Sequence, residues 1–302
     1  MKLSRSTLAT LLLFAVSCQV ASVQEPSAAT AGAPTVSSDA AEVAQLEEAP
    51  SPLDAALFQR YVILGSSASA GFNIRLDTGV PTRLADYFEA GLLIDSGLAS
   101  DGSTEFTFLD PEGFAGKAVR EALATDPTLV VGVDFLFWFF YGPGGPGNTL
   151  AFRRERLEAG IALLDKFSCP VLVGDLPNMA GAAGGMIPFG SMPPADSFTA
   201  ANARIREWAA GKENVIVVPL AEFNEIIGKG ESFQVGEFTW DPAVMGDLVQ
   251  ADRLHPNLAG CAVMALQIMH SLASSKGATL DGVIITNPED LADAVDDLVT
   301  SR

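Results

Sequence analysis

The stretch Arg60–Gly71, RYVILGSSASAG, decides the fold. Its apolar start, Tyr61–Leu64, is partly β-branched and ends abruptly in Gly-Ser-Ser, which is typical of a buried strand leading into a tight turn. The small residues at 68–70 allow close packing on the strand end, and Gly71 permits a second bend. In open α/β sheets, ligands bind just beyond the carboxyl ends of the strands. We therefore expect Ser67 to face a substrate, with a plain serine-rich turn as the alternative.

A second motif lies far along the chain, at Asp252-Arg253-Leu254-His255-Pro256-Asn257. The chain has 2 histidines, so His255 is one of two candidates for a base near neutral pH. Asp252 is close enough in sequence to reach back to the imidazole. A base and its orienting carboxylate on one loop are what nucleophilic catalysis requires. The alternative is a capped helix start with a solvated histidine.

Together these segments resemble the SGNH (GDSL-type) hydrolase superfamily over roughly residues 60–275. The family's first motif is Gly-Asp-Ser, with a glycine four residues after the serine. Here it reads Gly65-Ser66-Ser67 with Gly71, so a serine replaces the usual aspartate. The last motif, Asp-x-x-His-Pro, is intact at residues 252–256.

The resemblance implies an esterase or lipase-like serine hydrolase that cleaves acyl or acetyl esters without a cofactor or metal. Ser67 would be the nucleophile, His255 the base and Asp252 the residue that orients the base. The implied fold is a three-layer α/β/α, flavodoxin-like, doubly wound parallel sheet of five strands.

The family's third motif, Gly-x-Asn-Asp, supplies an oxyanion donor from its asparagine, but here Asp134 takes that place. An ionised carboxylate cannot donate and would repel the developing charge. One interpretation is that these apolar surroundings, VVGVDFLFWFFYG, keep Asp134 protonated, so that it donates as asparagine does. The alternative is an ionised Asp134 that holds loops together.

Three further residues are candidates for lining the oxyanion site. The family's second motif is a glycine whose N–H serves the oxyanion, and Gly113 and Gly116 are both open for that role, with ordinary turn or packing glycines as the alternative. Asn178 follows an expected strand and is a candidate donor, although a turn asparagine is the more common explanation. The aromatic run at 135–141 predicts either a lining for an acyl group or core packing.

Alternating strand and helix patterns predict the parallel sheet. Strands are expected at 60–66, 105–109, 128–134, 170–174 and 214–220. Helices are expected at 81–90, 113–124, 151–167, 257–275 and from 287 to about 299. Cys169 and Cys261 could pair in an oxidising compartment, and two buried thiols are the alternative.

The N-terminal segment predicts export. Residues 1–18 form a signal peptide with a short apolar core, and Ala15-Val16-Ser17-Cys18 resembles a lipobox with Cys18 acylated. Residues 19–52 are rich in small and acidic residues and lack Lys and Arg, so we expect a disordered linker before a single domain at 53–302. These features favour a periplasmic or cell-envelope lipoprotein with a membrane tether through Cys18.

Composition limits the possible partners. The formal net charge is −19, from 37 acidic and 18 basic residues, which argues against nucleic acid. We expect a small-molecule, glycan or lipid ester as substrate. The departures at Ser66 and Asp134 favour one alternative, an envelope protein that has lost catalysis and binds acyl or glycan ligands.

Overall fold

A computed structural model describes residues 49–142 and 147–302. The predicted signal peptide and nearly all of the predicted linker lie outside these residues. Within the predicted linker, the carbonyl of Ser51 accepts a hydrogen bond from the N–H of Thr279.

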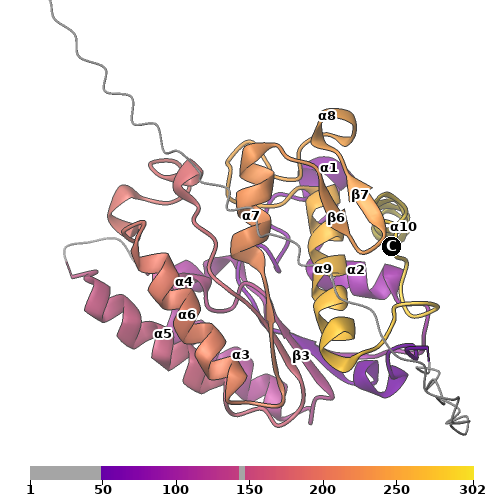
Figure 1. The fold of residues 1–302 in the computed structure, drawn as a ribbon, viewed down its shortest axis with the longest axis horizontal. Coiled ribbons are helices and arrows are strands. Elements are labelled where there is room, and N and C mark those ends of the chain that lie inside the picture. The colour runs from indigo at the N-terminus through magenta and orange to yellow at the C-terminus, as the bar shows by residue number, and fades with distance from the viewer. Residues whose placement is uncertain (1–48, 143–146) are drawn as a thin grey trace, which may run out of the picture. The chain divides into compact units, whose positions relative to one another are not determined.

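The domain is built on a five-stranded, all-parallel sheet of order β2-β1-β3-β4-β5, as the sequence predicts (Figure 1). The strands are β1 (Tyr61–Ile63), β2 (Leu98–Asp101), β3 (Leu129–Gly132), β4 (Val171–Gly174) and β5 (Val215–Val218). The chain order reverses between β1 and β3, which is where such sheets open a crevice.

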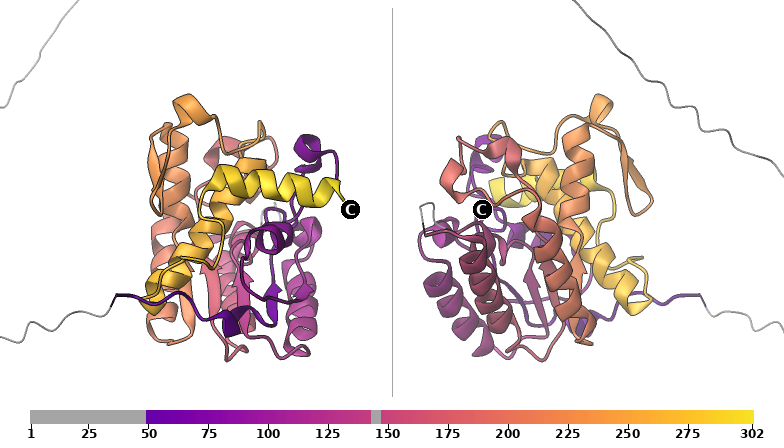
Figure 2. Two further views of the ribbon diagram at one scale, coloured as in Figure 1. Left: turned by 90° about the vertical axis from the view of Figure 1, so that its right-hand side faces the viewer. Right: turned by 60° about the vertical axis from the view of Figure 1, so that its left-hand side comes forward.

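Alternate residues of the strands enter two separate cores, which explains why both faces of the sheet are covered. Val62 and Val130 pack beneath α3 (Pro111–Leu123), α5 (Leu150–Leu164) and α6 (Ser197–Ala210). Ile63 and Val131 pack beneath α2 (Leu84–Gly91) and α9 (Leu258–Lys276) on the opposite face (Figure 1). α10 (Pro288–Thr300) packs on α2 and α9 (Figure 2). The three-layer α/β/α prediction is confirmed.

The central helix α9 is almost wholly apolar because the domain surrounds it. By length and composition it could cross a membrane, but 61% of its apolar window is buried inside the domain, as in a core helix. Cys261 on α9 and Cys169 before β4 are both free thiols, so they do not pair here. Burial raises the pKa of the Cys261 thiol to about 12.

The remaining elements connect the layers. They are the helices α1 (Arg75–Thr78), α4 (Phe137–Tyr141), α7 (Leu220–Lys229) and α8 (Pro242–Met245), the hairpin β6 (Phe233–Val235) and β7 (Phe238–Trp240), and the 3-10 helices η1 (Ala55–Phe58), η2 (Glu105–Phe108), η3 (Ala180–Ala182) and η4 (Phe189–Ser191).

The expected strand at 105–109 is wrong. Thr104 accepts a hydrogen bond from the N–H of Phe106 and caps η2 instead, leaving Phe106 and Phe108 exposed. The true second strand, β2, lies at the sheet edge and carries no apolar alternation, because it is only partly buried.

Candidate active site

The turn after β1 is shaped by close approach of a neighbouring strand end. A Cβ at Gly65 would overlap Asp134 Oδ1 and Ser69 Oγ, so only glycine fits there. Gly71 has a φ of +72°, and a Cβ on it would overlap the carbonyl of Thr82. Between these glycines the chain presents Ser67, which is half-buried.

Asp134, at the end of β3, holds this turn through four hydrogen bonds. Its Oδ1 accepts from the N–H of Ser66 (3.0 Å) and the hydroxyl of Ser69 (2.6 Å). Its Oδ2 accepts from the N–H groups of Ala68 (3.0 Å) and Ser69 (3.1 Å). Ser67 is the residue whose N–H Asp134 does not take, and that N–H has no hydrogen-bond partner among the described residues.

The contacts of Asp134 correspond to a loop-holding carboxylate rather than a donor. Both of its oxygens accept, and both face donors that belong to the turn. These contacts support the loop-holding alternative, in which Asp134 positions the turn.

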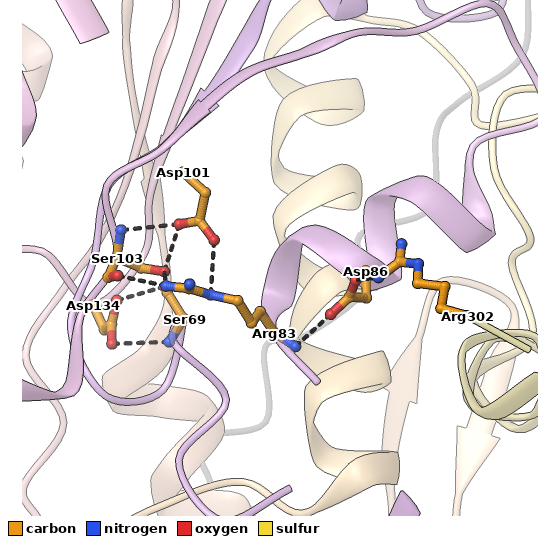
Figure 3. Close-up of polar contacts among 7 residues, drawn as sticks. All are labelled: Ser69, Arg83, Asp86, Asp101, Ser103, Asp134 and Arg302. Atoms are coloured by element: carbon orange, nitrogen blue, oxygen red, sulfur yellow. Dashed lines mark hydrogen bonds and ion pairs between the residues drawn. The ribbon is translucent and has the colours of Figure 1, made fainter. Parts of the chain in front are cut away.

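The other side of the turn is held by α2 and β2. The carbonyl of Ser69 accepts from the N–H of Leu84, the first residue of α2. The preceding residue, Arg83, pairs with Asp101 (2.9 Å) and donates to Ser103 (Figure 3). The turn is thus fixed by three strand ends and one helix start.

The loop that carries His255 is ordered by its own carboxylate. Arg253 has a left-handed φ of 56°, and the N–H groups of Leu254 and His255 both donate to Asp252 Oδ1. The His255 Nδ1–H donates to Asp252 Oδ2 at 2.7 Å. This pairing leaves Nε2 as the acceptor nitrogen of the neutral imidazole.

The charge of Asp252 follows from these bonds. Burial by itself would raise the pKa of Asp252, but the hydrogen bonds from the His255 ring and from two backbone N–H groups outweigh burial and lower it. Asp252 therefore stays ionised at neutral pH and remains an acceptor for Nδ1–H.

The turn that carries Ser67 and the loop that carries His255 contact each other directly. The Ser67 hydroxyl lies 2.9 Å from His255 Nε2, across a sequence separation of 188 residues. The Phe72 ring packs on the imidazole with centroids 4.3 Å apart. Gln250 Nε2 donates to the carbonyls of Phe72 (2.7 Å) and Pro256 (2.8 Å), and so ties the turn that carries Ser67 to the histidine loop.

The three remaining sequence candidates do not join this cluster. Gly113 lies on α3, and its N–H donates to the capping Asp110. Gly116 is inside the same helix, and Asn178 is exposed and does not line the cavity beside Ser67. Neither glycine lines a cavity beside Ser67, because the segment before α3 is η2 rather than a strand end. Gly102 follows the true strand, but its N–H donates to the carbonyl of Ile63.

The aromatic run at 135–141 divides between the two interpretations. Phe135, Phe139 and Phe140 are buried in the core under α5. Phe137 and Trp138 each line a cavity next to Ser67. Sequence reasoning missed the contributions of Phe72 and Gln250, which have no local pattern because they act only through tertiary contacts.

Comparisons with known proteins add little. No family model matches the chain, and no curated protein matches it. A solved structure described as "BT4096 a gut microbial diltiazem-metabolizing enzyme" is similar at a TM-score of 0.45 and 12% identity. The alignment covers 74% of this chain and 48% of that one, so the chain spans about half the length of that protein.

Proposed function

We propose that the protein is a serine hydrolase that cleaves an ester. The observation that carries the proposal is the contact of Ser67 Oγ with His255 Nε2, whose other ring nitrogen is held by Asp252. A nucleophile, a base and an orienting carboxylate in this order are the arrangement recognised by geometry in unrelated hydrolases. The divergent SGNH-like motifs lead to the same assignment.

In the proposed reaction, His255 Nε2 takes the proton of the Ser67 hydroxyl while Oγ attacks the ester carbonyl carbon. The free N–H of Ser67 donates to the carbonyl oxygen as it becomes negative. His255 then gives its proton to the departing alcohol, and a water molecule hydrolyses the acyl-enzyme with His255 again as base. Asp252 keeps Nδ1 protonated throughout, so Nε2 faces Ser67.

The supply of oxyanion donors sets the expected rate. The family positions a glycine N–H and an asparagine beside the serine N–H, and none of Gly113, Gly116, Asp134 or Asn178 does so here. Loss of one such donor typically costs about 10²–10³ in kcat. We expect a slow esterase.

The same shortage of donors favours a second candidate function, an envelope protein that binds acyl or glycan ligands without turnover. The predicted export signal and Cys18 tether fit either function. Reactivity of Ser67 separates the two, because a binding protein does not require an activated serine.

The test is labelling by a fluorophosphonate followed by peptide mass spectrometry. We expect the label on Ser67 and no label on Ser67→Ala. The matched control is Ser66→Ala, an adjacent serine with no contact to His255, which should still be labelled. Equal labelling of the Ser67→Ala variant, or none in the wild type, would refute the hydrolase and favour the binding protein.

A further inference from the structure

Ser67 lies at the junction of two apolar cavities. The first, called here the inner lobe, has a volume of about 120 Å³. It lies between the carboxyl ends of β3 and β4, α7 and α9. The second, the outer lobe, has a volume of about 340 Å³ and lies beside η2 and the segment 186–191. Ser67, Leu254 and His255 line both lobes, so a group bonded to Ser67 Oγ has one lobe on each side.

One side of the inner lobe is rigid, and its α7 side is half-buried. Val133, Leu176, Met179 and Met264 line it and are all buried in the two cores. Close-packed interiors do not widen without strain. An apolar cavity of about 150 Å³ holds a benzene molecule, so the inner lobe holds a chain of about four to six carbon atoms.

The outer lobe is larger and has exposed walls. Phe108, Leu109 and Met186 line it and are 43%, 62% and 39% exposed. They belong to connecting segments rather than to the sheet or its covering helices. A group in this lobe can extend past these side chains into solvent, so the lobe sets no upper limit on size.

Ester hydrolysis distinguishes the two sides. The bond from Ser67 Oγ to the acyl carbon forms as the bond to the alcohol oxygen breaks, and the alcohol takes the proton that His255 removed from Ser67. The alcohol must leave before water can attack, so it belongs in the lobe with exposed walls. The acyl group stays bonded to Oγ until water supplies its hydroxyl and returns a proton through His255, and it belongs in the lobe with buried walls.

We infer that the substrates are esters of short apolar acids, of about four to six carbons, with larger apolar alcohols. The inner lobe accepts the acid and the outer lobe the alcohol. This assignment rests on the proposed hydrolase function. It makes Phe223 and Ile227, half-buried residues of α7 that line the inner lobe, specificity-determining residues for the acid.

The test measures kcat/KM for p-nitrophenyl esters of straight-chain acids from two to twelve carbons. We expect a rise of about fourfold per added methylene up to the size limit and a steep fall beyond it. Phe223→Ala should move the optimum to longer acids. Ile227→Phe, which adds volume inside the same lobe, should move it toward acetate.

The matched control is Leu109→Ala in the outer lobe. It should leave the preferred acid length unchanged and lower kcat/KM severalfold for acetate esters of long alcohols. A reversed pattern, with Phe223→Ala changing only the alcohol preference, would overturn the assignment. So would a wild-type kcat/KM that rises steadily to twelve carbons.

Slow turnover does not prevent the test, since inactivation rates by fluorophosphonates of graded alkyl length report the same two lobes. Ser67 labelled at a rate independent of chain length would overturn the inference and leave the hydrolase proposal intact. No labelling of Ser67 by any fluorophosphonate would overturn both.

Discussion

Replacing Asp134 by asparagine tests how the nucleophile turn is held. The carboxylate accepts from the N–H groups of Ser66, Ala68 and Ser69 and from the Ser69 hydroxyl. An asparagine has one acceptor oxygen, and its NH₂ group only donates. The least damaging orientation puts the NH₂ at the Oδ1 position, where the Ser69 hydroxyl can turn to accept. The N–H of Ser66 then faces a donor.

These contacts set the size of the effect. A buried donor left without an acceptor costs about 1–3 kcal/mol, and the two remaining N–H bonds lose roughly 1 kcal/mol each when the acceptor becomes neutral. The asparagine also carries no buried charge, so part of the desolvation penalty of the carboxylate disappears, and this offsets some of the lost unfolding free energy. The net loss of unfolding free energy is about 2–4 kcal/mol, which lowers Tm by roughly 5–15 °C in a domain of this size. Distortion of the turn should lower kcat by about 10- to 100-fold.

Thermal unfolding and kcat across pH measure both effects. Asp110→Asn is the control, because asparagine caps a helix as well as aspartate does and should leave Tm almost unchanged. We expect the Asp134→Asn variant to be less active at every pH, with a pH profile of unchanged shape. A variant that keeps its Tm and gains activity only at high pH would refute the positioning role, since this is the behaviour of a protonated Asp134 that donates to the oxyanion.

Three further predictions concern other residues. Burial lowers the pKa of His270 below its ordinary value, so the unfolded chain binds a proton first as pH falls, and the unfolding free energy decreases below about pH 6.5. The unfolding free energy of His270→Gln, measured in urea, should depend less steeply on pH between 7 and 5 than that of the wild type. Equal pH dependence of the two proteins would contradict this. The Ser66 hydroxyl is buried without a hydrogen-bond partner, so Ser66→Ala should change the unfolding free energy by no more than about 1 kcal/mol, and a larger loss would reveal a partner. Cys18→Ser should move the protein out of the membrane fraction of a bacterial host, whereas an unmodified mature terminus elsewhere would leave plain export.

Local patterns sufficed for the central strands and the histidine loop. Val62, Val130 and Val171 lie in short apolar runs because both faces of their strands are covered, and such runs can be recognised without knowing the partner strand. Asp252 and His255 are three residues apart, so their pairing depends on one turn of backbone. The sequence pattern therefore led directly to their contact.

Sequence patterns do not identify a strand that lacks a buried apolar run. β2 is half exposed at the sheet edge, and its residues, LASD, resemble a loop. The alternating segment 105–109 resembled a strand, although its aromatic side chains line the outer lobe and the surface beside it. Gly113 and Gly116 follow this segment, so they lie on α3 and not at a strand end.

The sequence alone thus determined the class of fold and the central strands, and it predicted a nucleophile, a base and an orienting carboxylate that lie in contact in the structure. Only the tertiary structure decided what those groups contact. The sheet order brings the ends of β1 and β3 together, and this places Asp134 against the N–H groups of the turn that carries Ser67. The packing of α7 and α9 on the sheet sets the size of the inner lobe. Both results depend on contacts between residues far apart in the chain, which no local propensity or spacing encodes.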